Sequence, residues 1–105
     1  MPFNPVERPF LWQHLTASTQ VITTRCVLHT VTINHPDAAA GAMVTLHDVA
    51  AVGDIAPGNM IANIALDSAL FVIPNTLIYD VGCTNGLYAL FSAGLTTADI
   101  TVSYV

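Results

Sequence analysis

The stretch from Thr76 to Val105 reads TLIYDVGCTNGLYALFSAGLTTADITVSYV, three apolar runs separated by turn residues. Within 77–81 and 100–104, apolar or aromatic side chains recur at every second position, which is the period of a β-strand. Asn85-Gly86 between these runs favours a tight hairpin, because both residues tolerate positive φ angles. The stretch therefore predicts an antiparallel meander with strands near 76–82, 87–92 and 98–104.

The segments upstream continue this pattern of short strands. Residues 25–34, RCVLHTVTIN, predict a strand with Val27, His29, Val31 and Ile33 on one face. Residues 16–24 are rich in Thr, contain Val21 and Ile22, and suit an edge strand. Further strands are expected at 43–48 and at 59–66, where a helix fits the apolar pattern equally well. Residues 69–73 are expected to be a strand end or a bulged connection. Pro and Gly predict turns at 34–41 and 50–58.

Seven or eight short strands without a helix predict an all-β fold, a single antiparallel β-sandwich or jelly-roll-like barrel over residues 16–105. The chain has 105 residues, which is enough for one domain and its core. Residues 1–15 hold three of the six prolines and predict an extended N-terminal arm. For residues 10–15, an edge strand on the same sandwich is the alternative.

The composition favours contact with other protein chains. Hydrophobic residues make up 53% of the chain and charged residues 9%, whereas an ordinary soluble domain has about 25% charged residues. No apolar run approaches the roughly 20 residues of a membrane-spanning helix, so we expect no membrane contact and infer that part of the surface is buried against other subunits. The aromatic and aliphatic residues of the arm are the candidate partner-binding residues: Phe3, Phe10, Leu11 and Trp12.

Charge and the N-terminal sequence narrow the partner classes. The net charge is −5, and the two cations are Arg8 and Arg25, so the phosphate contacts of nucleic-acid binding are not expected. The N-terminus does not resemble a secretion signal, and we expect synthesis in the cytoplasm. Cys26 and Cys83 would stay reduced there as small buried side chains. A disulfide formed in an exposed, oxidised assembly is the alternative.

Catalytic and metal sites are not expected. His47-Asp48 point to opposite faces of a regular strand, and His35 and Asp37 flank a proline turn in which Asp accepts backbone hydrogen bonds. His29 would meet His47 if strands 25–34 and 43–48 formed a hairpin, but two histidines without a third ligand make a poor metal site. Asp48 and Asp80 are expected to anchor turns. We therefore predict a protein that is not an enzyme and has no cofactor or metal.

A sugar-binding module is a further possibility, because aromatic side chains on β-sandwiches stack on sugars. Trp12, Tyr79, Tyr88 and Tyr104 are the available residues. Tyr79 and Tyr104 alternate in register with core-type residues, however, and we expect them to be packed rather than presented.

Four phrases, VTIN at 31–34, VTLHD at 44–48, IYDVGCTNGL at 78–87 and TTADITVSY at 96–104, resemble a pattern of small proteins encoded among the structural genes of tailed bacteriophages. The similarity covers residues 27–105, and His47 stands where the pattern usually has an aromatic residue. It implies a virion protein, and the size and all-β character resemble those of capsid decoration (cement) proteins, which commonly sit as trimers where capsid subunits meet.

The resemblance and the composition together predict a non-enzymatic decoration protein on the capsid surface of a virion. Its expected partners are the major capsid protein and copies of itself in a homotrimer, with residues 1–15 docking on the shell. The alternatives are a neck, tail or fibre-base component, or a carbohydrate-binding module displayed on the virion.

Overall fold

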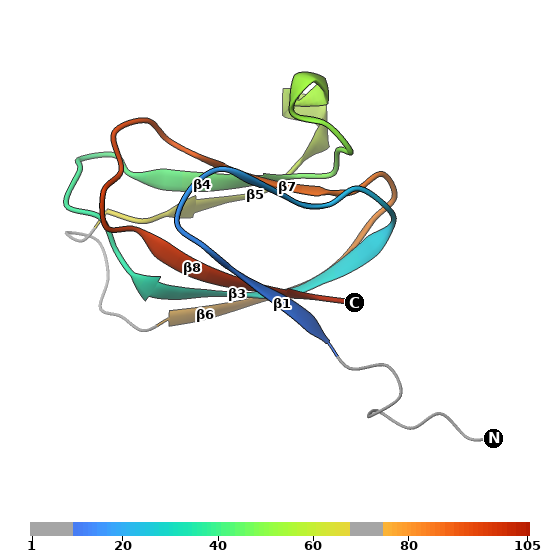
Figure 1. Ribbon diagram of the computed structural model, residues 1–105, viewed down its shortest axis with the longest axis horizontal. Coiled ribbons are helices and arrows are strands. Elements are labelled where there is room, and N and C mark those ends of the chain that lie inside the picture. The colour runs from blue at the N-terminus through green and yellow to red at the C-terminus, as the bar shows by residue number, and fades with distance from the viewer. Residues whose placement is uncertain (1–9, 68–74) are drawn as a thin grey trace.

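The computed structural model describes residues 10–67 and 75–105. These residues form two four-stranded antiparallel sheets that pack face to face as a β-sandwich (Figure 1). The eight described strands are β1 Leu11–Leu15, β2 Thr19–Ile22, β3 Cys26–His35, β4 Met43–His47, β5 Met60–Ala65, β6 Asn75–Cys83, β7 Leu87–Phe91 and β8 Asp99–Tyr104. The predicted all-β sandwich is confirmed.

The strand order is β1-β8-β3-β6 in the first sheet and β2-β7-β4-β5 in the second sheet. The ambiguous segment at 59–66 forms β5, and the predicted strand at 16–24 forms β2 at a sheet edge, as expected. Between β4 and β5 the chain makes two short 3-10 turns, η2 Val52–Asp54 and η3 Pro57–Asn59. No helix of the described residues is long and apolar enough to cross a membrane. The strand end expected within 69–73 lies outside the described residues.

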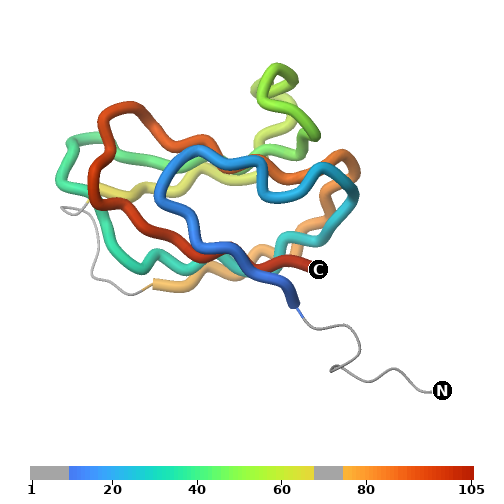
Figure 2. Tube along the Cα trace, in the orientation of Figure 1, coloured from blue at the N-terminus to red at the C-terminus, as the bar shows by residue number. Residues whose placement is uncertain are grey.

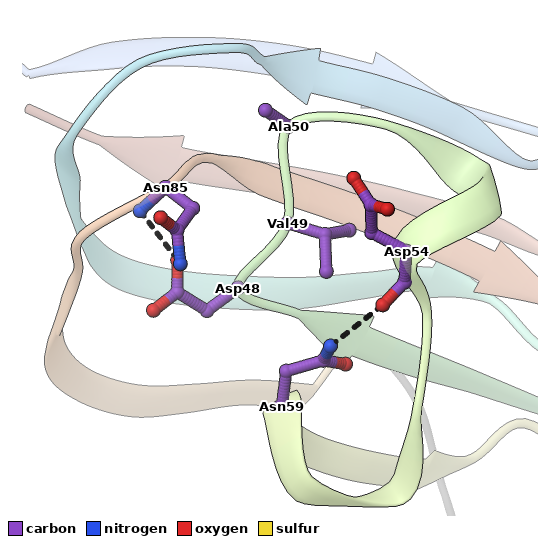
Figure 3. A pocket seen from close by; sticks show the side chains of 6 residues that line it. All are labelled: Asp48, Val49, Ala50, Asp54, Asn59 and Asn85. Atoms are coloured by element: carbon purple, nitrogen blue, oxygen red, sulfur yellow. Dashed lines mark hydrogen bonds between the residues drawn. The ribbon is translucent and has the colours of Figure 1, made fainter.

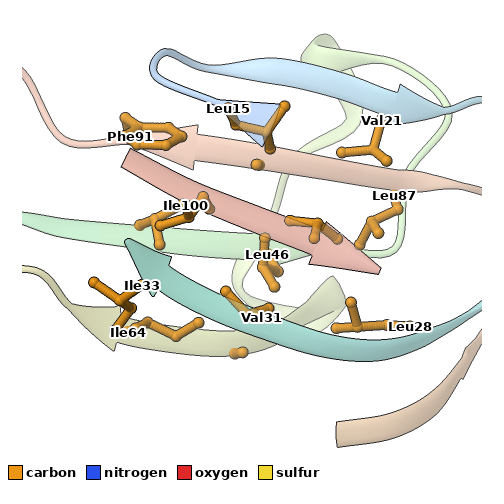
Figure 4. Packing of buried hydrophobic residues seen from close by; sticks show 14 of the residues in the cluster. Leu15, Val21, Leu28, Val31, Ile33, Leu46, Ile64, Leu87, Phe91 and Ile100 are labelled. Atoms are coloured by element: carbon orange, nitrogen blue, oxygen red, sulfur yellow. The ribbon is translucent and has the colours of Figure 1, made fainter. Parts of the chain in front are cut away.

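The core lies between the sheets and consists of aliphatic side chains that alternate along the strands (Figure 4). Both sheets contribute residues with no exposed surface: Leu28 and Val31 from β3, Val44 and Leu46 from β4, Leu87 from β7, and Ile100 and Val102 from β8. Tyr104 is buried and Tyr79 packs against this core, as predicted. Burial of such side chains is the main favourable term of folding.

The predicted antiparallel meander over 76–104 is wrong. β6 pairs with β3, β7 pairs with β2 and β4, and β8 pairs with β1 and β3. Successive strands therefore alternate between the sheets, and the Asn85-Gly86 turn carries the chain from the first sheet to the second. A Cβ on Gly86 would lie 2.6 Å from the carbonyl oxygen of Val49 and 2.7 Å from that of Ile22. Glycine is needed at this turn for the close approach of two other backbone segments.

The predicted face of strand 25–34 needs a correction as well. Val27 was expected on the same face as Val31, but Val27 is 40% exposed and Val31 is fully buried. The register between β3 and β8 shifts between Leu28 and Thr30. A β-bulge adds one residue to one strand of a pair and so changes which side chains face the core.

The boundary between arm and sandwich also differs from the prediction. Leu11–Leu15 is strand β1, paired with β8 from Leu11↔Tyr104 to Leu15↔Ile100, so the sandwich begins before residue 16 (Figure 2). The alternative for residues 10–15, an edge strand on the same sandwich, is correct for this segment. The rest of the predicted arm, residues 1–9 with Phe3, lies outside the described residues.

Candidate docking surface

The first sheet contains the two longest described strands, β3 and β6, and one of its sides faces outward. We call this side the outer face. Strand pairing aligns its side chains in rows, one with Trp12, Ser103, Thr30 and Ile78 and the next with His14, Thr101, Thr32 and Thr76. Val27 and Val105 exchange two backbone hydrogen bonds and lie opposite each other at one end. Small hydroxyl side chains thus occupy the middle of the face, with larger side chains around them.

One half of the outer face carries large exposed apolar side chains around Ser103 and Thr30. These apolar side chains are Phe10, Trp12, Val27, Ile78 and Val105, and we call this group the apolar half. Trp12 is 68% exposed and Ile78 is 72% exposed. Of nine large hydrophobic side chains exposed among the described residues, these five and the edge residue Leu11 belong to the first sheet or its flanks. Exposed apolar side chains that gather in one patch are typical of interaction sites.

Phe10 is held in place by an aromatic contact. Its ring stacks on the ring of His29, with centroids 4.2 Å apart and planes inclined by 12°. His29 Nδ1 in turn contacts Asp80 Oδ1. Asp80 has a φ angle of 51°, and the register of β6 against β3 shifts between Leu28 and Thr30. The predicted turn-anchoring role of Asp80 is therefore wrong, because it lies within β6 and contacts a histidine across the sheet.

The other half of the outer face is polar and hydrogen-bonded. His14 Nε2 lies 2.5 Å from Asp99 Oδ1, and Asn34 Nδ2 donates to Asp99 Oδ1 and to Thr101 Oγ1, both at 2.9 Å. Burial raises the pKa of Asp99, but hydrogen bonds from Asn34 and His14 outweigh it, and the net pKa is below the ordinary value. Each carboxylate on the outer face thus has a histidine partner, Asp99 with His14 and Asp80 with His29.

The structure separates the histidines considered for a metal site. His29 lies in the first sheet and His47 in the second, so the hairpin that would join them does not form. His47 is buried, with Nε2 2.9 Å from Thr45 Oγ1 and Nδ1 3.3 Å from Asn59 Oδ1. Among the described residues, no group of three or more His, Cys, Asp or Glu is arranged to hold a metal ion.

Asp37 has a structural environment. It is 1% exposed, and its carboxylate accepts backbone hydrogen bonds from Thr96, Thr97 and Ala98 at 2.7 to 3.0 Å and from Ala39 at 3.0 Å. These bonds, chiefly those from Thr97 and Ala39, lower the pKa of Asp37 to about 2. His35 Nδ1 lies 2.6 Å from the carbonyl oxygen of Pro36, so it does not form a pair with Asp37. The predicted backbone-binding role of Asp37 is confirmed.

A surface depression of about 310 Å³ lies at the end of β4, lined by Asp48, Val49, Ala50, Asp54, Asn59 and Asn85 (Figure 3). Asp48 Oδ2 accepts hydrogen bonds from Thr84 N and Oγ1, both at 3.1 Å, and Asp48 Oδ1 accepts from Asn85 N at 2.8 Å and Gly86 N at 3.3 Å. Asn59 Nδ2 donates to the carbonyl oxygen of Asp54 at 2.8 Å. The predicted role of Asp48 as a turn anchor is confirmed, and the depression is a by-product of this turn.

The predicted partner-binding residues divide between the two sides of β1. Phe10 and Trp12 belong to the outer face, whereas Leu11 alternates to the other side and is half exposed at the sheet edge. The sequence reasoning missed Val27, Ile78 and Val105. Ile78 had a usable signal, because it alternates with Leu77 and Tyr79 of the core side and must then point outward.

Comparisons of the chain with protein-family models, with curated proteins and with solved structures find no match.

Proposed function

We propose that this chain is a non-enzymatic structural protein that docks on a protein shell, as a capsid decoration protein of a tailed bacteriophage. The observation that carries the proposal is the apolar half of the outer face, where Trp12 and Ile78 are about 70% exposed. Leaving such side chains in water forfeits roughly 25 cal/mol for each Å² of apolar area that a partner would cover. The phrases shared with phage structural proteins support the choice of partner, the major capsid protein.

The outer face has features that suit protein docking. It is built on paired strands, so its side chains need little ordering when a partner binds. The carboxylates on it already have histidine partners, which reduces the number of unpaired charges that an interface would have to desolvate. Trp is among the side chains that most often dominate binding energy, and Trp12 is the largest exposed side chain of β1.

Co-sedimentation with capsids tests this proposal. Capsids would be purified from a phage whose copy of this gene is deleted, and the added chain would be measured in the pellet. We expect Trp12→Ser and Ile78→Ser each to weaken binding at least about tenfold, because truncation of a central interface residue typically has such an effect. Val52→Ser is the matched control, since Val52 is 57% exposed in η2, which projects from the second sheet (Figure 1). Equal binding by all three variants would contradict the proposal.

Self-association is tested separately, by size-exclusion chromatography with light scattering. The proposed homotrimer predicts three times the 11.1 kDa chain mass. If the trimer dissociates in Trp12→Ser, the outer face forms the contact between the subunits of the trimer and not the contact with the shell. A monomer at all concentrations would remove the homotrimer from the proposal and leave shell binding by single copies.

A carbohydrate-binding module is the second candidate, and one observation favours it. The exposed indole of Trp12 lies next to a row of Ser and Thr hydroxyls and near the His14–Asp99–Asn34 network, and sugars bind to such combinations of a flat ring and polar groups. A glycan array distinguishes the two candidates. Glycan binding that is lost in Trp12→Ser, together with unchanged capsid binding, would favour the carbohydrate module.

A further inference from the structure

Cys26 and Cys83 face each other across two neighbouring strands of the first sheet. Cys26 is the first residue of β3, Cys83 is the last residue of β6, and the two are direct partners in the antiparallel register. Both thiols are free and lie within hydrogen-bonding reach of each other. Their exposed fractions are 4% and 1%, so both side chains point to the core side of the sheet.

The backbone pairing defines how far apart the two Cα atoms lie. Val27 exchanges both of its backbone hydrogen bonds with Val105, the residue that follows β8, at 2.8 and 3.0 Å. Because backbone groups alternate in direction along a strand, those of Cys26 point to β6, and Cys26 and Cys83 form a hydrogen-bonded pair. Such pairs have Cα atoms about 5.5 Å apart, and disulfides join Cα atoms about 4.4 to 6.8 Å apart. The Cα separation of such a pair therefore lies within the range that disulfides span.

We propose that Cys26 and Cys83 are a redox modification site, and that the folded chain forms an intramolecular disulfide between them when it meets an oxidising disulfide such as glutathione disulfide. The thiolate of one cysteine attacks a sulfur of glutathione disulfide and releases one glutathione thiolate, which gives a mixed disulfide. The second protein thiolate attacks the protein sulfur of this mixed disulfide and releases the second glutathione. The protein loses two electrons and two protons, and one glutathione disulfide becomes two glutathione molecules.

The environments of the two thiols indicate the order of attack. Burial raises the pKa of both thiols, and burial together with the neighbouring Cys26 raises the pKa of Cys83 to about 12. The hydrogen bond with Cys83 lowers the pKa of Cys26, and Cys26 follows the exposed Arg25 at the end of the sheet, so we assign the first attack to Cys26. Once Cys26 is in the mixed disulfide it carries no charge, and its effect on Cys83 ceases. The reaction is slow, because burial limits both access and ionisation.

The bond would be reversible. Opposite Cβ atoms in antiparallel pairs are about 4.5–5.5 Å apart, and a relaxed disulfide needs about 3.5–4.5 Å. The strands must therefore approach slightly, and a strained disulfide is more easily reduced than a relaxed one. The crosslink would close a loop of more than half of the chain and attach the edge strand β6 to β3, which restricts the unfolded state. This inference concerns the isolated chain and does not depend on shell binding.

Peptide mapping of the native chain tests the inference. The purified reduced protein would be incubated at pH 8 with glutathione disulfide, quenched with a thiol-alkylating reagent and digested without reduction. We expect a peptide pair linked through Cys26 and Cys83 and a mass of the intact chain that is lower by two hydrogens. After unfolding, the oxidised chain should have no free thiol left to react with the alkylating reagent. We also expect the oxidised protein to unfold at a temperature higher by at least about 5 °C, an increase that dithiothreitol reverses.

The single variants Cys26→Ala and Cys83→Ala are the matched controls. Each keeps one thiol, and neither shows the increase in unfolding temperature after oxidation. Oxidation of the wild type requires no substitution, so the test remains valid if a variant folds poorly. Three outcomes of prolonged oxidation of the native chain would each overturn the inference. They are two alkylated cysteines, a mixed disulfide that does not resolve, and crosslinked dimers in place of the internal bond.

Discussion

Replacing Asp48 by Ala tests how the two sheets are held at one end of the sandwich. Asp48 follows β4 of the second sheet, and its carboxylate accepts four hydrogen bonds from the 84–86 turn, which begins at the end of β6 in the first sheet. Hydrogen bonds to a charged acceptor each contribute roughly 1.5–3 kcal/mol to stability. In the alanine variant all four donors lose this acceptor.

The expected loss is smaller than the sum of the four bonds. Thr84 and Asn85 are exposed, so water replaces the carboxylate at their donors, whereas Gly86 is buried and its N–H is left without a partner. We expect a destabilisation of about 2–3 kcal/mol, which for a domain of this size lowers the unfolding temperature by roughly 10–20 °C. Thermal unfolding followed by circular dichroism measures this shift.

The effect of Asp48→Ala should depend on pH in one direction. Burial raises the pKa of Asp48, but backbone hydrogen bonds from Asn85 and Thr84 outweigh it, and the net pKa is below the ordinary value. A carboxyl group with a lowered pKa in the folded state stabilises above its unfolded pKa, about 3.9. This contribution is lost as the pH falls through the folded pKa. The difference between variant and wild type should therefore be constant above about pH 5 and shrink below about pH 4.

Asp54→Ala is the matched control, because Asp54 lines the same depression, and its backbone N–H and C=O take part in hydrogen bonds. It removes the same charge and should change the stability by no more than about 0.5 kcal/mol. The reasoning is refuted if Asp48→Ala unfolds within about 2 °C of the wild type, or if both variants are destabilised equally.

Three further predictions concern stability. Gly86→Ala should lower the free energy of unfolding by at least about 2 kcal/mol in urea titration, because the added Cβ would lie 2.6 Å from a backbone oxygen. Gly53→Ala is the control and should be neutral, because Gly53 has open space around it. Equal urea midpoints for the two variants would contradict this prediction. Asp37→Asn should lower the unfolding temperature at pH 7. The difference in unfolding temperature between this variant and the wild type should shrink as the pH falls from 4 towards the folded pKa of about 2. A difference that is constant with pH would be inconsistent with the lowered pKa. Leu46→Ala should lower the free energy of unfolding by about 2–5 kcal/mol, since Leu46 is fully buried. Ile78→Ala, at a 72% exposed site, should be near neutral. Comparable losses of stability in the two variants would argue against the assigned core.

The strands themselves were predictable, because period-two alternation is a local property of the chain. Residues 100–104 alternate buried and partly exposed positions as expected. The partner of each strand was not predictable in the same way. Asn85-Gly86 is compatible with a hairpin within one sheet and with a turn between sheets, and the choice depends on Asp48, which lies 37 positions from Asn85.

The candidate docking surface was predictable only in part, for a similar reason. Trp12 was identified from the apolar character of its segment, and it is exposed on the outer face. Val27 was assigned to the core side, because a bulge near His29 leaves no signal in the alternation of residues 27–33. One extra residue in a strand moves every later side chain of that strand to the opposite face of the sheet. The cluster of Val27 with Ile78 and Val105 could therefore not be found without the structure.

The position of β8 between β1 and β3 in the first sheet has a consequence for biosynthesis. β1 has no other strand to pair with in that sheet, so this layer cannot close until residues 99–104 have left the ribosome. Closure of the first sheet is therefore slow, because contacts between distant segments form late. During this interval the apolar strands are open to chaperones or to aggregation, and a ribosome that stalls shortly before residue 99 yields a chain unable to mature.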